Sequence, residues 1–568
     1  MGTETNPAPA RSPSITAGPP LTAEPGLGSL TLPGFLRDVT TTYREREALV
    51  LPAADAVTRW TYAELWERAI DVARALRACG LGKDGRVGVL MTNRPEWIAA
   101  VFGISLAGGV AVTLSTFSTP SELDYLLRVS GVSVLLFERE VLKKDFAAIL
   151  AELEPEIGKA GPGALQSARY PFLRRLAMIG EPAPGETIEV WDVFLARGHA
   201  EPRDLVELTA AAVHPSDAAV LFFSSGSTSK PKGILSAHRG VAIQLWRFRR
   251  MYQFSPEDNV RCWTANGLFW SGNFGMALGA TLASGGALVL QPAFIAAEAL
   301  ELMQAERVNF PVAWPHQWAQ LEGAPNWPQV DMSSLRFVDF NTPLAHHPTV
   351  SARWFEPGHA YGNTETFTIS TCFPANTPPD VHAGSSGEAL PGVTVKIVDP
   401  GAGGVVPRGE RGEICVKGPT LMLGYVGTPL DETLDADGFF RTGDGGYLDD
   451  AGRLFWEGRL TDLIKTGGAN VSPLEVDEAL ASIPGVKVAH TVGVPHETLG
   501  EVVVACIVPH EGASLSAEEI RTVLRERLAS YKVPRHVLFF REGEILLTGS
   551  AKIKSSDLRQ LAAKRLQG

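Results

Sequence analysis

The segment Leu221-Phe-Phe-Ser-Ser-Gly-Ser-Thr-Ser-Lys-Pro-Lys-Gly233 decides most about the fold, because an apolar strand runs directly into a loop of small residues, hydroxyls and two lysines. Backbone N–H groups in such a loop can surround phosphate oxygens, and lysine adds positive charge. It is not a Walker A loop, since the pattern G-x-x-x-x-G-K-S/T begun at Gly226 would need its second glycine at Pro231. Taken alone, the segment is either a phosphate-binding loop or a flexible surface linker.

Alternating helical and strand patterns surround this loop. Thr61–Ala78 repeats apolar residues at helical spacing, whereas Val87–Met91 and Val134–Phe137 are short apolar runs typical of buried parallel strands. Beyond Pro379, short strands separated by Gly and Asp predict a β-rich section, and Ser472–Gln567 has the pattern of a compact α+β tail. The predicted fold class is therefore α/β, with a large N-terminal α/β body of several subdomains, a β-rich section and a small α+β C-terminal domain.

The composition excludes several classes of protein. The chain has 568 residues, of which 45% are hydrophobic and 20% charged, as in ordinary globular proteins. Its 51 basic and 63 acidic residues give a net charge of −12, which argues against a nucleic-acid partner. The five cysteines are far apart and form no C-x-x-C pair, so we expect neither a disulfide framework nor a thiolate zinc site. A reducing compartment follows, and we predict a cytoplasmic location.

Neither a secretory signal nor a membrane span is expected. Residues 1–30 are rich in Pro, Ala, Gly, Ser and Thr and have no apolar core, which predicts a disordered leader. Trp97–Ser121 and Cys262–Ala297 are long and uncharged, but paired glycines interrupt both. Each therefore predicts a buried helix followed by a buried strand, so we expect no integral membrane segment.

The quoted loop resembles the ATP-binding loop of the adenylate-forming superfamily, which includes acyl-CoA ligases, adenylation domains and luciferases. The matching stretch is Phe223–Gly233, followed by His238, and its main departure is Ser229, where the family usually has glycine. The resemblance continues in family order from about Pro33 to Arg559 and is closest to an acyl-CoA ligase. It implies that the nucleotide contacts Ser224, Ser225, Gly226, Ser227, Thr228 and Lys232.

Two further segments resemble the family's nucleotide site. Ala360–Thr366 looks like the Y-G-x-T-E segment, in which an aromatic residue lies against adenine, Thr contacts the α-phosphate and Glu binds Mg²⁺. Asn341-Thr-Pro-Leu344 resembles the turn on the adenine side. The resemblance thus implies nucleotide contacts by Asn341, Thr342, Tyr361, Gly362 and Asn363, catalytic roles for Thr364 and Glu365, and a metal ligand in Glu365.

The C-terminal part carries the remaining family matches. Arg441-Thr-Gly-Asp444 resembles the motif whose Asp holds the ribose, and Arg459 is expected to reach the nucleotide. The resemblance implies a hinge at Thr461, a coenzyme A channel beside Gly467 and Gly468, and a catalytic lysine at Lys552. The expected domains are an N-terminal domain of residues 31–459 and a mobile C-terminal domain of residues 460–568. Thr461 itself, Leu546 and Ala551 depart from the family pattern.

The reaction implied by the resemblance has two steps. A carboxylate attacks the α-phosphorus of Mg·ATP to give an acyl-adenylate, and the thiol of coenzyme A then displaces AMP. Large aromatics that could line an apolar acid pocket are Phe269, Trp270, Trp314 and Trp318. We expect a hydrophobic acid as substrate, because no Asp placed to hold an amino acid's ammonium group is evident.

Two alternatives remain open at this stage. The enzyme could load an acyl carrier protein in place of coenzyme A. The departures at Ser229, Leu546 and Ala551 also leave room for a nucleotide-binding protein without catalysis. Each single match has an ordinary structural explanation, because Thr-Gly-Asp is a common turn and lysines are frequent near chain ends.

Overall fold

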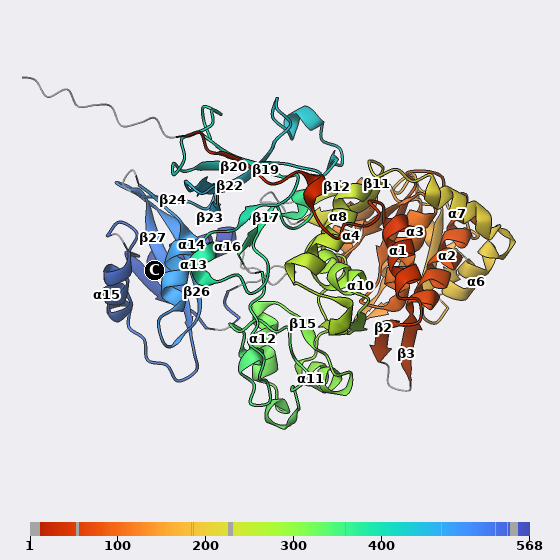
Figure 1. The fold of residues 1–568 in the computed structure, drawn as a ribbon, viewed down its shortest axis with the longest axis horizontal. Helices are drawn as coiled ribbons and strands as arrows, with labels where there is room; N and C mark the ends of the chain where they lie inside the picture. The colour runs from red at the N-terminus through yellow and green to blue at the C-terminus, as the bar shows by residue number, and fades with distance from the viewer. Residues whose placement is uncertain are drawn as a thin grey trace, which may run out of the picture. The chain divides into compact units, whose positions relative to one another are not determined.

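A computed structural model gives the fold (Figure 1). It describes residues 12–52, 56–182, 185, 187–224, 231–357, 359–466, 469–528, 530–541, 543–545 and 555–567. The chain is a mixed α/β protein that divides into two compact units. The larger unit comprises residues 17–394 and 416–440, and the smaller unit comprises residues 1–16, 395–415 and 441–568. No helix in the described part of the chain is long and apolar enough to span a bilayer.

The larger unit is built on an eight-stranded sheet, and the quoted loop connects two neighbouring strands of it. Its strands, in spatial order, are β10 (Ile188–Val190), β9 (Arg175–Ile179), β6 (Val134–Glu138), β4 (Arg86–Leu90), β5 (Val110–Thr113), β11 (Ala218–Ser224), β12 (Lys232–Ala237) and β21 (Gly424–Tyr425). The strands from β10 to β11 run parallel, whereas β12 and β21 add antiparallel pairs. The buried apolar runs therefore form parallel strands, as predicted.

Helices cover this sheet as the apolar periodicity predicts. The helix α2 (Tyr62–Ala78) begins at a capping box in which the Thr61 side chain accepts from Glu64 N–H and the Glu64 carboxylate accepts from Thr61 N–H. Figure 1 shows helices gathered along one side of the unit, among them α1 (Leu32–Thr42), α2, α3 (Pro95–Leu106) and α7 (Arg203–Ala211). The helix α3 is buried and is followed by strand β5, so the uncharged stretch around it is core.

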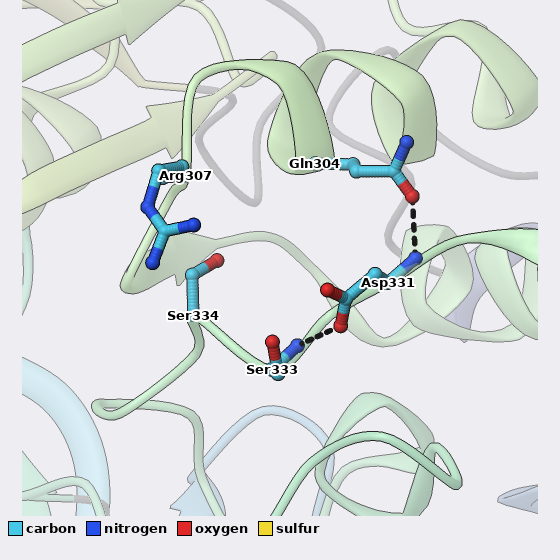
Figure 2. Close-up of a pocket in the computed structure, with 5 residues that line it drawn as sticks. All are labelled: Gln304, Arg307, Asp331, Ser333 and Ser334. Carbon is cyan, nitrogen blue, oxygen red and sulfur yellow. Dashed lines mark hydrogen bonds between the residues drawn. The ribbon is translucent and has the colours of Figure 1, made fainter.

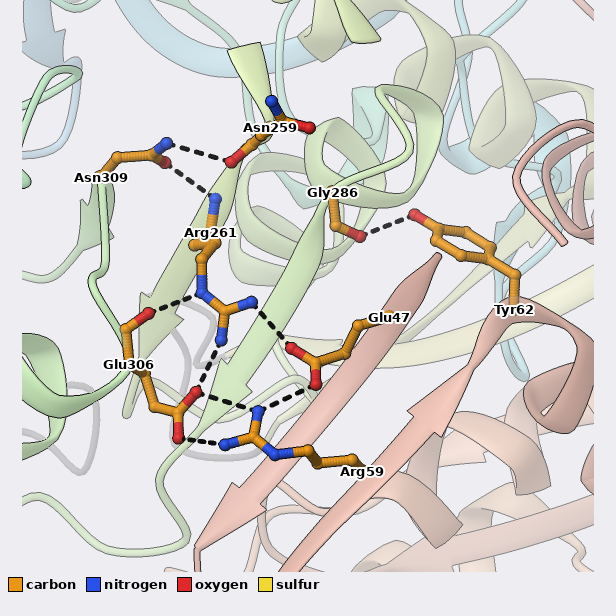
Figure 3. Close-up of polar contacts among 8 residues, drawn as sticks. All are labelled: Glu47, Arg59, Tyr62, Asn259, Arg261, Gly286, Glu306 and Asn309. Carbon is orange, nitrogen blue, oxygen red and sulfur yellow. Dashed lines mark hydrogen bonds and ion pairs between the residues drawn. The ribbon is translucent and has the colours of Figure 1, made fainter. Parts of the chain in front are cut away.

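A second sheet carries the segment in which the acid pocket was expected. Its strands, in order, are β15 (Phe310–Val312), β13 (Arg261–Thr264), β14 (Ala287–Leu290), β2 (Glu47–Pro52) and β3 (Val57–Thr61). Figure 3 shows four charged side chains joined across it, in which Arg59 and Arg261 each bind both Glu47 and Glu306 at 2.6–2.8 Å. These paired charges fix the amino end of β13, and the carboxyl end of β13 leads into residues 265–270.

The described part of the expected leader, residues 12–30, packs against folded elements. Glu24 is fully buried and binds the equally buried Arg247 of helix α8 (His238–Met251) through two hydrogen bonds of 2.9 and 2.7 Å. A buried guanidinium needs a carboxylate partner, and Glu24 supplies it. Low hydrophobicity alone therefore gave a wrong expectation of disorder for residues 12–30.

The smaller unit holds two further sheets. The first runs β1 (Ile15–Ala17), β19 (Thr394–Val398), β20 (Gly412–Lys417), β22 (Phe440–Leu448) and β23 (Leu454–Arg459). The second runs β25 (Ala469–Val471), β24 (Ile464–Thr466), β27 (Gly500–Pro509) and β26 (Val486–His496), with β28 (His536–Phe539) also paired to β27. Three helices accompany it: α14 (Pro473–Ala481), α15 (Ala517–Arg527) and α16 (Ser555–Gln567). The tail is α+β, as expected, and the expected domain boundary at residue 460 stays a prediction.

All five cysteines are free, as their spacing predicted. Cys262, Cys372 and Cys506 are buried, and burial raises the pKa of each thiol to about 12. These three thiols are therefore protonated at neutral pH and behave as small apolar core residues.

Candidate functional site

The strands on either side of the quoted loop are fixed by pairing. Ser224 at the end of β11 lies opposite Lys232 at the start of β12. The hydroxyl of Tyr125, in helix α4 (Pro120–Ser130), donates to the carbonyl of Pro231 at 3.3 Å. The predicted contacts Ser225, Gly226, Ser227 and Thr228 lie outside the described residues, so their roles stay predictions.

His238, which follows the loop, has a structural explanation. Burial lowers its pKa to about 4, so its imidazole is neutral at pH 7. Its Nδ1 atom accepts a hydrogen bond of 3.2 Å from the N–H of Leu32. The histidine thus ties the start of α1 to the start of α8.

The Tyr361–Glu365 segment has a rigid backbone. Strand β16 (Ala360–Tyr361) leads to Gly362, where an added Cβ atom would lie 1.7 Å from the carbonyl oxygen of Thr368, so only glycine fits. The side chain of Asn363 then accepts from Thr366 N–H and caps a short 3-10 turn, Thr364–Thr366. Just beyond this turn, the buried amide of Gln244 donates to Ile369 O at 2.7 Å. Tyr361 to Glu365 therefore form one ordered loop.

This loop lies beside the start of β12, and Tyr425 contacts both. The Tyr425 hydroxyl donates to Oε1 of Glu365 at 2.7 Å, and Met422 N–H donates to Glu365 O at 2.7 Å. The ammonium nitrogen of Lys232 lies 4.8 Å from the centroid of the Tyr425 ring. The structure therefore brings together Lys232 and Glu365, two predicted site residues from distant parts of the chain. Tyr425 was missed because its local sequence is that of an ordinary strand aromatic.

The donor set at Glu365 suits Mg²⁺ held mainly by substrate. Among the described residues no three His, Cys, Asp or Glu side chains cluster as a metal cage. Mg²⁺ is commonly held by one or two carboxylates together with phosphate oxygens and waters. One half-buried carboxylate beside a lysine fits that requirement, and the role of Glu365 as a metal ligand stays a prediction.

The predicted adenine-side turn is organised by Asp339. Its carboxylate accepts from Asn341 N–H at 2.7 Å, and its carbonyl accepts from the Thr342 hydroxyl at 2.7 Å. The turn then enters a short 3-10 helix, Pro343–His346. Asp339 thus fixes the backbone at Asn341 and Thr342, although neither the sequence nor the resemblance singled it out.

Phe269 and Trp270 belong to a group of three aromatic rings. Their ring centroids are 4.9 Å apart, and Phe117 stacks on Trp270 at 6.0 Å with an interplanar angle of 18°. Thr113 at the end of β5 donates to Phe269 O, which brings this group to the edge of the sheet where β5 and β11 end. Phe117 is 51% exposed, so this group, called here the aromatic trio, is open on one side. Phe117 was missed because it lies in a turn without a periodic pattern.

The other two predicted pocket aromatics lie at helix α12 (Pro315–Glu322). Trp314 immediately precedes this helix, and its backbone N–H donates to Gln317 Oε1 at 2.9 Å. Trp318 packs partly against an apolar core cluster that includes Leu321 and Met332. Within the described part of the chain, no ring contact joins Trp314 or Trp318 to the aromatic trio. Their assignment to the acid pocket stays a prediction.

The smaller unit brings Asp444 and Arg459 together. They face each other across β22 and β23, with Arg459 Nε 3.0 Å from Asp444 Oδ1. Asp444 is buried, whereas the Arg459 side chain is 48% exposed and its Nη1 donates to Thr442 O at 2.8 Å. The pair therefore presents one buried carboxylate and one accessible guanidinium, which suits hydroxyl and phosphate groups respectively.

Three predicted residues of the smaller unit are outside the described residues: Gly467, Gly468 and Lys552. Thr461 is described and is exposed in the turn that follows Arg459, where Asp462 N–H donates to Arg459 O at 3.0 Å. Its hinge role, the coenzyme A channel and the catalytic lysine stay predictions.

A surface hollow elsewhere in the larger unit does not coincide with these residues. Figure 2 shows its lining side chains, which enclose about 340 Å³: Gln304, Arg307, Asp331, Ser333 and Ser334. The backbone N–H of Asp331 donates to the side chain of Gln304, and the Asp331 carboxylate accepts from the N–H of Ser333. These polar groups therefore have hydrogen-bond partners within the hollow itself. None of the predicted site residues lines this hollow.

Comparison with known proteins agrees with this arrangement. The family model described as AMP-binding enzyme matches residues 36–426, and its C-terminal domain model matches residues 475–552. A Rhodococcus jostii CoA ligase named for a methyl-dioxo-octahydroindenyl propanoyl group is 30% identical over 90% of this chain and 95% of its own. A medium-chain acyl-CoA ligase of Danio rerio is 29% identical over 95% of this chain and 89% of its own. The crystal structure of an anthranilate CoA ligase with anthranoyl-AMP is 25% identical, with a TM-score of 0.77 over 96% of this chain and 100% of its own.

Proposed function

The chain belongs to the family of AMP-binding enzymes, and we propose that it is an AMP-forming ligase of a hydrophobic carboxylic acid and coenzyme A. In the first step the carboxylate attacks the α-phosphorus of ATP, forming an acyl-adenylate and releasing pyrophosphate. In the second step the thiol of coenzyme A attacks the acyl carbon, AMP leaves, and the thiol proton passes to solvent. The free cysteines support a reducing compartment, and we propose the cytoplasm.

One observation carries this proposal: Lys232 and Glu365 share the partner Tyr425 at the start of β12. A lysine beside a carboxylate supplies the two kinds of group that a metal–nucleotide complex requires, because the ammonium attracts phosphate oxygens and the carboxylate binds the cation. When bound there, Mg²⁺ would neutralise charge on the phosphates. The protein's own contribution is to orient acid and nucleotide and to place positive charge where it develops.

The aromatic trio supports a hydrophobic acid. Phe117, Phe269 and Trp270 present rings in stacked and edge-to-face contact beside the carboxyl ends of β5 and β11, where α/β proteins commonly bind ligands. The relatives described above are named for ring-containing or medium-chain acyl groups. A large apolar acid is therefore the substrate class that we propose for this enzyme.

A pyrophosphate-release assay across carboxylic acids, with and without coenzyme A, tests the function. We expect release with medium-chain and aromatic acids, and acyl-CoA with AMP only when coenzyme A is added. Release that depends on an acyl carrier protein would favour carrier loading. No release with any acid would favour a nucleotide-binding protein without this chemistry.

Replacing Asp444 should weaken nucleotide binding. In the Asp444→Ala variant we expect the dissociation constant of ATP to rise at least about tenfold, because a charged hydrogen-bond acceptor for the ribose is lost. Arg459 is half exposed, so water can solvate it once its partner is gone, and the fold should survive. Calorimetric titration with ATP measures the effect. Asp450→Ala removes the same charge from an exposed turn and should bind ATP normally; equal affinities in both variants would exclude the ribose role.

Replacing Phe117 should impair use of the acid but not of ATP. For Phe117→Ala we expect the KM of an accepted hydrophobic acid to rise roughly 3–10-fold, the size of one lost aromatic contact. The KM of ATP should stay within twofold. Phe172→Ala, at another exposed phenylalanine, is the matched control and should leave both constants unchanged. A rise in the KM of ATP equal to that of the acid would remove Phe117 from the acid pocket.

A further inference from the structure

Tyr425 stands between the two charged side chains on which the proposed function depends. Its ring is within cation–π distance of the Lys232 ammonium, and its hydroxyl donates to the Glu365 carboxylate. Among the described residues, no ion pair joins Lys232 directly to Glu365. The tyrosine therefore contacts both charges while the two charges do not contact each other.

Backbone hydrogen bonds of the residues on both sides of Tyr425 fix its position. Leu423 N–H donates to Leu235 O at 2.7 Å, and Val426 N–H donates to Gly233 O at 2.8 Å, so β21 is fixed to the strand that begins at Lys232. Met422 N–H fixes the main chain of Glu365. The ring also packs against the buried side chains of Ile234, Met422 and Phe440. The position of the hydroxyl is thus set by strand pairing and packing.

A phenol is chemically suited to a position between an ammonium group and a carboxylate. A neutral hydroxyl donor occupies one carboxylate oxygen without cancelling the negative charge, so the carboxylate keeps its charge for a cation. A ring face stabilises the ammonium but offers it no anion, so the ammonium keeps its charge for phosphate. Direct pairing of Lys232 with Glu365 would instead neutralise both groups. Partners of this kind, one step away from a metal ligand, orient the ligand and tune its affinity.

We propose that Tyr425 is a positioning residue that holds Glu365 toward a divalent cation and keeps Lys232 available for the phosphates of the nucleotide. This role rests on the proposed function, because it assumes that a metal–ATP complex binds at the start of β12. It assigns to Tyr425 a role that acts through Glu365, without a contact of its own to the reacting atoms.

The test is a Mn²⁺ titration of the full-length protein in the presence of ATP, followed by electron paramagnetic resonance. For Tyr425→Phe, which keeps the ring, we expect the dissociation constant of Mn²⁺ to rise roughly tenfold, the lower end of the effect of losing such a partner. Metal-free ATP affinity should change less than twofold. Tyr425→Leu, which also removes the ring, should weaken metal-free ATP binding as well. Tyr447→Phe, at a ring stacked on Phe455 in β23, is the matched control and should leave both constants unchanged.

A double-mutant cycle separates positioning from general damage. If Tyr425 acts through Glu365, then adding Tyr425→Phe to Glu365→Ala should cause no further loss of Mn²⁺ affinity. Independent losses in the two variants would overturn the proposal, as would unchanged Mn²⁺ affinity in Tyr425→Phe with ATP binding intact. If the unmodified protein binds no ATP, the proposed function fails and the role of Tyr425 fails with it.

Discussion

Lys552→Ala should slow acyl-adenylate formation by roughly 10²–10³-fold, the cost of removing one preorganised charged group from a transition state. The proposed first step brings an anionic carboxylate to an anionic phosphate, and negative charge builds up on the oxygens around phosphorus. A lysine ammonium at that point lowers the barrier more than it strengthens ground-state binding. The KM of ATP should therefore change much less than the rate of pyrophosphate release.

The second half-reaction is the internal control for Lys552. Thioester formation from supplied acyl-adenylate does not build charge at phosphorus in the same way, so its rate should fall much less. Lys564→Ala removes the same charge from an exposed position on α16 and should leave both rates unchanged. Equal losses in the two half-reactions of Lys552→Ala would show that the lysine supports the fold or the nucleotide generally, not adenylation.

The local elements of this fold could be predicted from sequence because their signals are local. The helical periodicity after Thr61 and its Glu64 capping partner mark α2, and the apolar runs at Val87 and Val134 mark two parallel strands. The loop after Phe223 was also placed correctly at the end of a strand. In each case a few adjacent residues determine the outcome.

The contacts that complete the candidate site could not be predicted, because they join distant parts of the chain. Tyr425 meets Glu365 only because β21 pairs with β12, and a strand pair separated by so many residues leaves no local signature. Glu24 similarly finds Arg247 across 223 residues, which overrides the low hydrophobicity around it. Phe117 lies in a turn, where no periodicity distinguishes a wall of a site from an exposed ring.

The turn after Arg459 makes the hinge prediction testable. Asp462 N–H and Leu463 N–H both donate to Arg459 O, and Leu460 N–H donates to Gly443 O at 2.9 Å. Within the described residues, Thr461 N–H donates no hydrogen bond, so a proline there would remove none. Proline still fixes its own φ and disfavours the α conformation of the preceding residue. Thr461→Pro therefore changes the backbone freedom of this turn and little else.

If the C-terminal domain beginning near Thr461 rotates between the half-reactions, Thr461→Pro should affect them unequally. An orientation that requires a backbone angle forbidden to proline is disfavoured by about 3 kcal/mol, or roughly 10²-fold in population. We expect one half-reaction to slow by that factor and the other to change less than threefold. Single-turnover pyrophosphate release and coenzyme A-dependent AMP release from supplied adenylate measure the two rates. Thr461→Ala removes the same side chain without fixing φ and should leave both near normal. If Thr461→Pro slows both half-reactions equally, or slows neither, the hinge lies elsewhere. A fixed φ at the hinge residue should affect two different domain orientations unequally.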